Sequence, residues 1–122
     1  MIGGLSQAAS VNLQGRAMTT TSTSVTVYVT YQGTPETRFD RDYYVRHHLP
    51  LVMKAWRPYG LESVAAFFPA IAAAGTIAIC ECRFRGEAAV DAAFGSPATP
   101  GVRNDVPRFT DAAPARARAV PL

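Results

Sequence analysis

Segments with strand character and segments with helix character alternate along this chain in an order that suits few folds. The segment Ser24–Tyr31, SVTVYVTY, places three valines and Tyr31 on one face and two threonines and Tyr28 on the other, which predicts a strand. The full order is strand, helix, strand, strand, helix, strand, which is the split βαβ pattern. We therefore expect an α+β fold of ferredoxin-like type, in which a four-stranded antiparallel sheet carries its helices on one face. The expected strands are Ser24–Tyr31, Leu61–Phe68, Thr76–Arg85 and Ala115–Val120, the expected helices are Asp40–Trp56 and Gly86–Phe94, and a loop at Ser96–Gly101 precedes a short helical turn within Val102–Thr110.

The predicted sheet is apolar on both faces. Ile77 and Ile79 fall on the face opposite Cys80 and Cys82, and one set of positions in Leu61–Phe68 adds to that face. Two helices cover only one face, so the other would leave apolar surface in water in a single copy. We therefore predict a homodimer whose sheets pack face to face.

The helix expected at Asp40–Trp56 has a clear start and an interruption. Asp40 can accept hydrogen bonds from the free N–H groups of the first turn. Pro50 removes one backbone donor and clashes with the preceding turn, so we expect a kink or a break at His48–Leu49, with Leu49 pushed out of helical geometry. A second helical piece is expected at Pro50–Trp56. The residues expected on the inner face are Tyr44, His48, Leu51, Val52 and Ala55.

Length and composition indicate one domain. The chain has 122 residues, 48% of them hydrophobic and 17% charged, which is enough apolar material for one core. Residues 1–23 are rich in Gly, Ser, Thr and Ala, so we expect a flexible extension before a domain at 24–122. Met18 offers a second start, and residues 1–17 are expected to lie upstream of the fold.

The sequence contains no pattern that predicts a membrane span. The longest apolar stretch, Val64–Ala74, includes Pro69 and is too short for a bilayer. Residues 1–17 lack a basic segment followed by an apolar run, which a secretory signal would have. We expect a cytoplasmic protein that does not bind membranes.

The charge pattern argues against nucleic-acid binding. The formal net charge is +3, but Arg41 and Arg46 lie among Asp40 and Asp42. A nucleic-acid binder normally shows a basic stripe together with a recognisable module, and neither is visible in the sequence. Alanine and arginine alternate in Ala115–Val120, and we expect these arginines to protect an edge strand against aggregation.

The two cysteines are expected to be free, buried thiols. Cys80 and Cys82 are two apart on one predicted strand, so a bridge between them would be strained. A zinc site that adds His47 and His48 is the alternative, but Cys-x-Cys is not a usual zinc spacing. The sequence also lacks a Gly-rich phosphate loop. We therefore expect neither a metal nor a cofactor.

Two segments resemble the EthD family. They are RFDRDYYVRHHLPLVMKAW at Arg38–Trp56 and NDVPRFTDAAP at Asn104–Pro114, and the likeness extends over residues 25–122. The family is similar to dimeric α+β barrel proteins, and its members are often described as oxidoreductase-like. Related barrels include cofactor-free monooxygenases, decarboxylases and cyclases that act on hydrophobic or aromatic molecules, which is the chemistry that the resemblance implies.

His48 is the leading candidate for a catalytic residue. A histidine has a reference pKa of about 6.5 and exchanges a proton near neutral pH. Tyr44 lies one turn earlier on the same face and can anchor a ligand. The second family-like segment suggests that Asp105 orients the imidazole. The structural alternative is that His48 only bonds a backbone carbonyl at the kink. Candidates for an apolar pocket wall are Tyr31, Trp56, Phe67 and Phe68, although aromatic residues at such spacings more often form plain core.

Three functions remain open from the sequence. The first is a cofactor-independent oxidoreductase, monooxygenase or decarboxylase-like enzyme that binds a small hydrophobic or aromatic molecule and uses His48 as acid or base. The second is a non-catalytic binding or accessory protein of an oxygenase-linked degradation pathway. The third is a purely structural dimer module, which would have no cavity.

Overall fold

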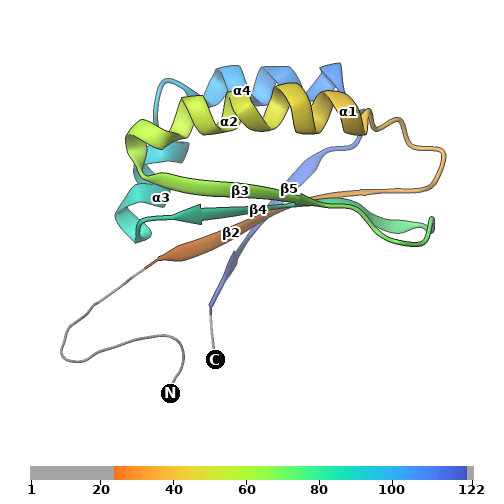
Figure 1. Cartoon of the computed structure of the whole chain (residues 1–122), viewed down its shortest axis with the longest axis horizontal. Coiled ribbons are helices and arrows are strands. Elements are labelled where there is room, and N and C mark those ends of the chain that lie inside the picture. Colours follow the sequence, from red (N-terminus) through yellow and green to blue (C-terminus); the bar gives the residue numbers. More distant parts are fainter. Residues whose placement is uncertain (1–23, 121–122) are drawn as a thin grey trace.

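Four strands form one antiparallel sheet in the order β3-β4-β2-β5 (Figure 1). The computed structural model describes residues 24–120, so the extension expected at 1–23 lies outside the described residues. In this sheet the first and third strands of the domain are central, which is the order of a ferredoxin-like fold and confirms the predicted class. The strand bounds are β2 Val25–Gly33, β3 Leu61–Phe67, β4 Gly75–Phe84 and β5 Pro114–Ala119.

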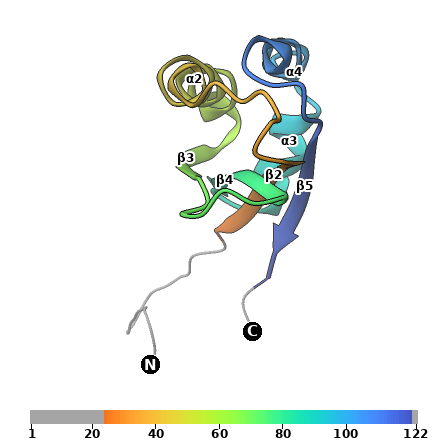
Figure 2. The same cartoon turned by 90° about the vertical axis from the view of Figure 1, so that its right-hand side faces the viewer.

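Two helices lie side by side over one face of the sheet. Helix α2 (Leu49–Trp56) and helix α4 (Thr99–Asp105) run next to each other above the strands in both views (Figures 1 and 2). Helix α3 (Glu87–Phe94) lies at the end of the sheet where β4 ends (Figure 1). No helix in the described part of the chain is long and apolar enough to cross a membrane.

The helix is irregular just before Pro50 but does not break, and the expectation that Leu49 leaves helical geometry is wrong, because a wide helical turn accommodates the proline. The short helix α1 (Arg41–Tyr43) continues into a π-helical turn, η2 (Tyr44–His48), and then into α2. The Leu49 N–H donates to the Tyr44 carbonyl, five residues back, and Leu49 keeps helical angles of φ −63° and ψ −42°. Pro50 therefore stands in the first turn of α2, where its missing N–H costs little. The predicted cap is confirmed, since the Tyr43 N–H donates to Asp40 Oδ1 at 3.0 Å.

Helix α4 starts earlier than the sequence predicts. Ser96–Gly101 was expected to be a loop, but Thr99–Gly101 form the first turn of α4. Pro100 is tolerated in this first turn because the N–H that proline lacks would have no partner within the helix there. A single 3₁₀ turn, η4 (Val106–Arg108), follows α4 and leads to β5.

The apolar surface opposite the helices is smaller than expected, because Ile77 leaves it. The pairing of β2 with β4 shifts register after Tyr31, and Ile77 has no partner in β2. It is 9% exposed and belongs to the core. Ile79 stays on the outer face, where it pairs with Phe67 on one side and Thr30 on the other.

The core fills the space between the sheet and the helices. The inner-face positions of β4 are buried, as are Tyr44, His48 and Val52 of the expected inner helix face. Leu51 and Ala55 are only half-buried, and Leu49 and Trp56 take the buried positions instead, because the π turn rotates α2 about its axis.

Candidate functional site

A cavity of about 240 Å³ lies between the inner face of the sheet and helices α2 and α4. Its wall is largely apolar, and His48 is part of it. The lining residues are Val29, Tyr44, His48, Val52, Trp56, Cys80, Cys82, Thr99, Val102, Arg103, Val106, Pro114 and Arg116.

A histidine–aspartate pair borders this cavity. His48 Nδ1 lies 2.9 Å from Asp105 Oδ2, and the Tyr43 hydroxyl donates to Asp105 Oδ1 at 2.8 Å. The Arg108 Nε lies 3.5 Å from the same oxygen. Because Nδ1 donates to the carboxylate, the other ring nitrogen, Nε2, is the one that can accept a proton. Within residues 24–120 no protein group bonds to Nε2.

Burial keeps this histidine neutral near pH 7. The His48 side chain is 5% exposed and the Asp105 side chain 12% exposed. Burial lowers the pKa of His48 below 6.5, and the Asp105 carboxylate acts in the opposite direction without cancelling this effect. For Asp105, burial would raise the pKa, but hydrogen bonds from His48 and Tyr43 lower it overall, so the carboxylate stays charged. A neutral imidazole held by a charged carboxylate is the arrangement of a general base.

Tyr44 supports the His48 ring and stays protonated. The two rings stack with centroids 5.5 Å apart and an interplanar angle of 19°. Burial raises the pKa of the Tyr44 phenol far above its ordinary value, and Cys80 and Tyr31 add to the effect. Tyr44 can therefore donate a hydrogen bond but is unsuited to act as a base.

The two thiols form part of the cavity wall. Cys80 and Cys82 are free, and their Sγ atoms lie 3.7 Å apart. The contact with Cys80, followed by burial, raises the pKa of the Cys82 thiol. Within residues 24–120 no group of three His, Cys, Asp and Glu side chains is placed to hold a metal ion.

The structure places the four aromatic candidates in different surroundings. Trp56 lines the cavity, and its Nε1 donates to Thr99 Oγ1 at 3.1 Å. Tyr31 is 2% exposed and lies behind Tyr44, at 5.8 Å between ring centroids, outside the cavity wall. Phe68 packs against Phe39 and Tyr44 and is also outside that wall.

Phe67 is separated from the site by the sheet. It pairs with Ile79 on the outer face and is 51% exposed. The structure therefore brings together His48, Tyr44, Asp105 and Trp56 from the predicted set, and it leaves out Tyr31, Phe67 and Phe68.

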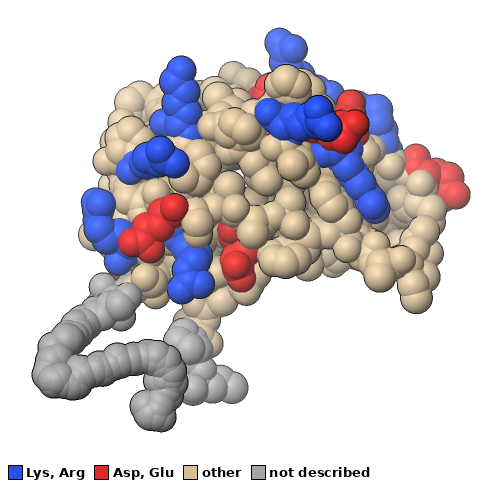
Figure 3. All heavy atoms as spheres, viewed as in Figure 1, with Lys and Arg blue, Asp and Glu red and all other residues tan. Residues whose placement is uncertain are grey.

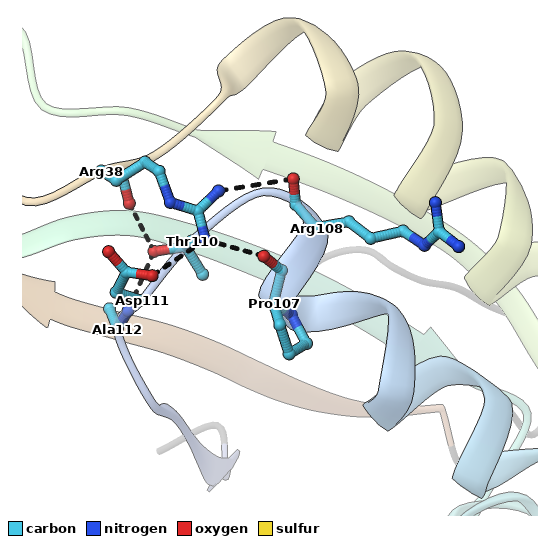
Figure 4. Close-up of polar contacts among 6 residues, drawn as sticks. All are labelled: Arg38, Pro107, Arg108, Thr110, Asp111 and Ala112. Atoms are coloured by element: carbon cyan, nitrogen blue, oxygen red, sulfur yellow. Dashed lines mark hydrogen bonds and ion pairs between the residues drawn. The ribbon is translucent and has the colours of Figure 1, made fainter.

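Polar contacts of Arg38, here called the polar clamp, hold the segment 107–111, just after Asp105, against the chain just before α1 (Figure 4). The Arg38 guanidinium donates to the carbonyl oxygens of Pro107 and Arg108 and to Asp111 Oδ1, at 2.7, 3.4 and 2.9 Å. The Thr110 hydroxyl donates back to the Arg38 carbonyl at 2.7 Å. Asp105 lies just before this clamped segment, so the clamp sets its position opposite His48.

Sequence reasoning missed several groups that shape the site. Tyr43 was passed over because only Tyr44 has the spacing of the inner face, yet its hydroxyl reaches Asp105. Arg103 carries no local motif, and the alternation that includes Arg116 predicted only the protection of an edge strand; the place of both arginines in the cavity wall depends on the packing of α4 and β5. The aromatic pair at Tyr43 and Tyr44 was the one available signal.

The surface charges are mixed in sign. Figure 3 shows Lys and Arg side chains interspersed with Asp and Glu over the face in view, without a stripe of one sign.

The fold and the site together define a ferredoxin-like α+β domain with a buried histidine–aspartate pair beside an apolar cavity. No family model and no curated protein matches the sequence. Among solved structures, an EthD-like protein of Ralstonia eutropha matches with a TM-score of 0.70 and 21% identity, covering 81% of this chain and 92% of that one. An EthD family protein of Bacillus halodurans matches with a TM-score of 0.61 and 16% identity, covering 81% and 99%.

A third solved structure extends the comparison beyond EthD-like proteins. A candidate antibiotic biosynthesis monooxygenase of Bacteroides thetaiotaomicron matches with a TM-score of 0.51 and 11% identity, covering 82% of this chain and 90% of that one. At these identities the likeness shows a shared fold. The resemblance expected from Arg38–Trp56 and Asn104–Pro114 is thereby confirmed for the fold of the domain.

Proposed function

We propose that this protein binds a small aromatic molecule in the cavity and that His48 moves a proton to or from it. The observation that carries the proposal is the 2.9 Å contact between His48 Nδ1 and Asp105 Oδ2 in the wall of an apolar cavity. The sequence alternative, in which His48 only bonds a backbone carbonyl at a kink, has less support, because its Nδ1 partner is a carboxylate and the helix is unbroken.

The size of the cavity favours a molecule of about one ring. An apolar cavity of about 150 Å³ is known to take up benzene. The cavity beside His48 measures about 240 Å³, which leaves room for substituents on such a ring. Pockets for drug-sized ligands are larger, at about 300–1,000 Å³.

The geometry of the histidine–aspartate pair supports a proton transfer of the following kind. Nε2 accepts a proton from a hydroxyl or an acidic C–H of the ligand, and the bonding electrons remain on that oxygen or carbon. The resulting imidazolium is stabilised by the Asp105 carboxylate on its other nitrogen. An oxygenase-type reaction would continue with attack of a ligand carbanion on dioxygen, which is the oxidant: a C–O bond forms, the O–O double bond becomes a single bond, and the resulting peroxide anion takes up the proton held on His48. A decarboxylase-type reaction would run the transfer in reverse, with the imidazolium protonating the carbanion left by carbon dioxide. The fold shared with a candidate monooxygenase supports the first course.

4-Nitrophenol tests the role of His48, because its phenolate absorbs visible light. We expect the wild-type protein to lower the apparent pKa of the bound phenol by about one unit, which corresponds to about 1.4 kcal/mol. His48→Gln should remove this shift, since the amide side chain can bond Asp105 but cannot accept the proton. The measurement is a pH titration of phenolate absorbance with saturating protein.

Two controls make this titration decisive. His47→Gln alters an exposed neighbour and should keep the shift. 4-Nitroanisole lacks the proton and should bind with an affinity that does not depend on pH. An equal shift in wild type and His48→Gln would remove His48 from the mechanism. Binding of 4-nitrophenol with no shift would favour the non-catalytic accessory function, and failure of both probes to bind would contradict the proposal that this cavity binds a phenol.

We also propose that two copies pair through the outer face of the sheet. A row of side chains crosses that face from Phe67 through Ile79 and Thr30 to Ala115. Phe67 is 51% exposed in one copy, and a second copy would cover this row.

Ile79→Glu tests the proposed dimer, since it places a charge at the centre of this row. Sedimentation velocity at two protein concentrations should show a wild-type dimer and a folded monomeric variant. Ile71→Glu is the matched control, because Ile71 is 79% exposed but lies in the hairpin between β3 and β4. A wild-type protein that sediments as a monomer at both concentrations would contradict the dimer.

A further inference from the structure

Two arginine side chains form part of the cavity wall on its solvent side. Arg103 comes from α4 and Arg116 from β5, and both residues are exposed. The other end of the same cavity is closed by buried residues, among them Tyr44 and Cys80. The cavity therefore has an apolar interior and a mouth with two guanidinium groups.

These guanidinium groups lack acidic partners within residues 24–120. The ion pairs there engage other arginines: Arg38 with Asp111, Arg108 with Asp105, and Arg118 with Glu87 and Asp91. Arg103 and Arg116 take part in none of them. The Arg116 guanidinium instead lies 4.2 Å above the centre of the Phe94 ring, and this cation–π contact restrains it at the mouth.

The carboxylate that borders this cavity, Asp105, does not neutralise this charge. Both oxygens of Asp105 are already engaged by His48 and Tyr43, and Arg108 approaches it as well. Burial also keeps His48 neutral near pH 7. The mouth of the cavity is therefore left with two uncompensated positive charges.

We propose that the ligand is an aromatic carboxylate, with its carboxylate bound by Arg103 and Arg116 and its ring in the apolar interior. This inference rests on the proposed function, because it names the class of molecule that the same cavity takes. Guanidinium groups match carboxylates through paired N–H donors, and the contact is stronger than that of neutral partners. The opposite orientation would place the carboxylate among apolar walls, where loss of its hydration is costly.

A pair of probes that differ in charge tests this assignment. Benzoate and benzyl alcohol have rings of the same size, but only benzoate is an anion. Calorimetric titration of the wild-type protein should show benzoate binding about tenfold more tightly, with an affinity that falls as salt is added. Arg103→Gln and Arg116→Gln should each weaken benzoate about fivefold and leave benzyl alcohol unchanged. Arg83→Gln, on the outer face of the sheet, is the matched control and should change neither affinity.

The outcomes separate this inference from the proposed function. Equal affinities for the two probes in wild type would overturn the carboxylate assignment and leave an aromatic site in place. An equal loss of both probes in the arginine variants would also overturn it, because it would point to damage of the cavity rather than to a lost charge. Failure of both probes to bind to the wild-type protein would overturn the cavity proposal and this inference with it.

Discussion

Replacing Phe109 with alanine is expected to lower the free energy of unfolding by about 3–5 kcal/mol. Phe109 is fully buried, and its ring lies 4.6 Å from the His48 ring and 4.9 Å from the Tyr44 ring, measured between centroids. It also contacts Tyr31 and Phe39 at 5.9 and 5.2 Å. Removal of the ring would leave a cavity at the centre of this aromatic cluster, and the surrounding side chains could collapse only in part. Chemical denaturation of the purified variant measures the loss.

Phe109→Leu is the control for this prediction, because it keeps most of the side-chain volume. We expect it to cost less than about 1.5 kcal/mol. If the alanine variant lost no more than the leucine variant, the aromatic cluster would not be the packing centre that the structure indicates. Phe109 also matters to the site, since its carbonyl accepts the Asp40 N–H at 2.8 Å and so ties the chain beyond Asp105 to the start of the helix.

Replacing Gly60 with alanine is expected to cost about 2–5 kcal/mol, the second large effect. Gly60 has φ +112°, a backbone conformation that costs a residue with a side chain about 1–2 kcal/mol. A Cβ added at this position would lie 2.4 Å from the Cβ of Ala89, so helix α3 would have to move. Such overpacking adds about 1–3 kcal/mol. Thermal and denaturant unfolding both measure the effect.

Gly75→Ala separates the two contributions to the Gly60 effect. Gly75 has φ +127°, but a Cβ there would meet no atom within 4 Å. We expect this variant to lose only the conformational part, about 1–2 kcal/mol. A double-mutant cycle with Ala89→Gly should show coupling at Gly60. Equal losses at Gly60 and Gly75, without coupling to Ala89, would contradict the packing of η3 (Arg57–Tyr59) against α3.

Local patterns predicted the elements well and their interruptions poorly. The alternation in Ser24–Tyr31 placed β2, and Asp40 marked the start of the helix, because strand periodicity and capping depend on neighbouring residues. Pro50 was predicted to kink or break the helix at His48–Leu49, but the helix continues through a π turn at the cost of one shifted hydrogen bond. Ile77 was predicted to face outward, but a register shift that depends on the pairing with β2 turns it into the core.

The candidate site also contains residues that a local pattern predicts and residues that only the tertiary packing brings in. His48 and Tyr44 could be chosen from the sequence because both lie on one face of one helix, and a one-element periodicity is visible in the chain itself. Asp105 was predicted as a site residue only through the resemblance to the EthD family. Tyr43, Arg103 and Arg116 were not predicted as site residues.

The sequence by itself determined the order of the elements, the apolar inner face and the helix that carries His48, since these follow from periodicity and capping over a few residues. Only the tertiary structure decided that Asp105 meets His48, that Phe67 is cut off from the cavity, and that two arginines stand at its mouth. These relations join residues that are tens of positions apart in the chain. Their distances depend on how α4 and β5 pack against the rest of the fold, and no local pattern encodes that packing.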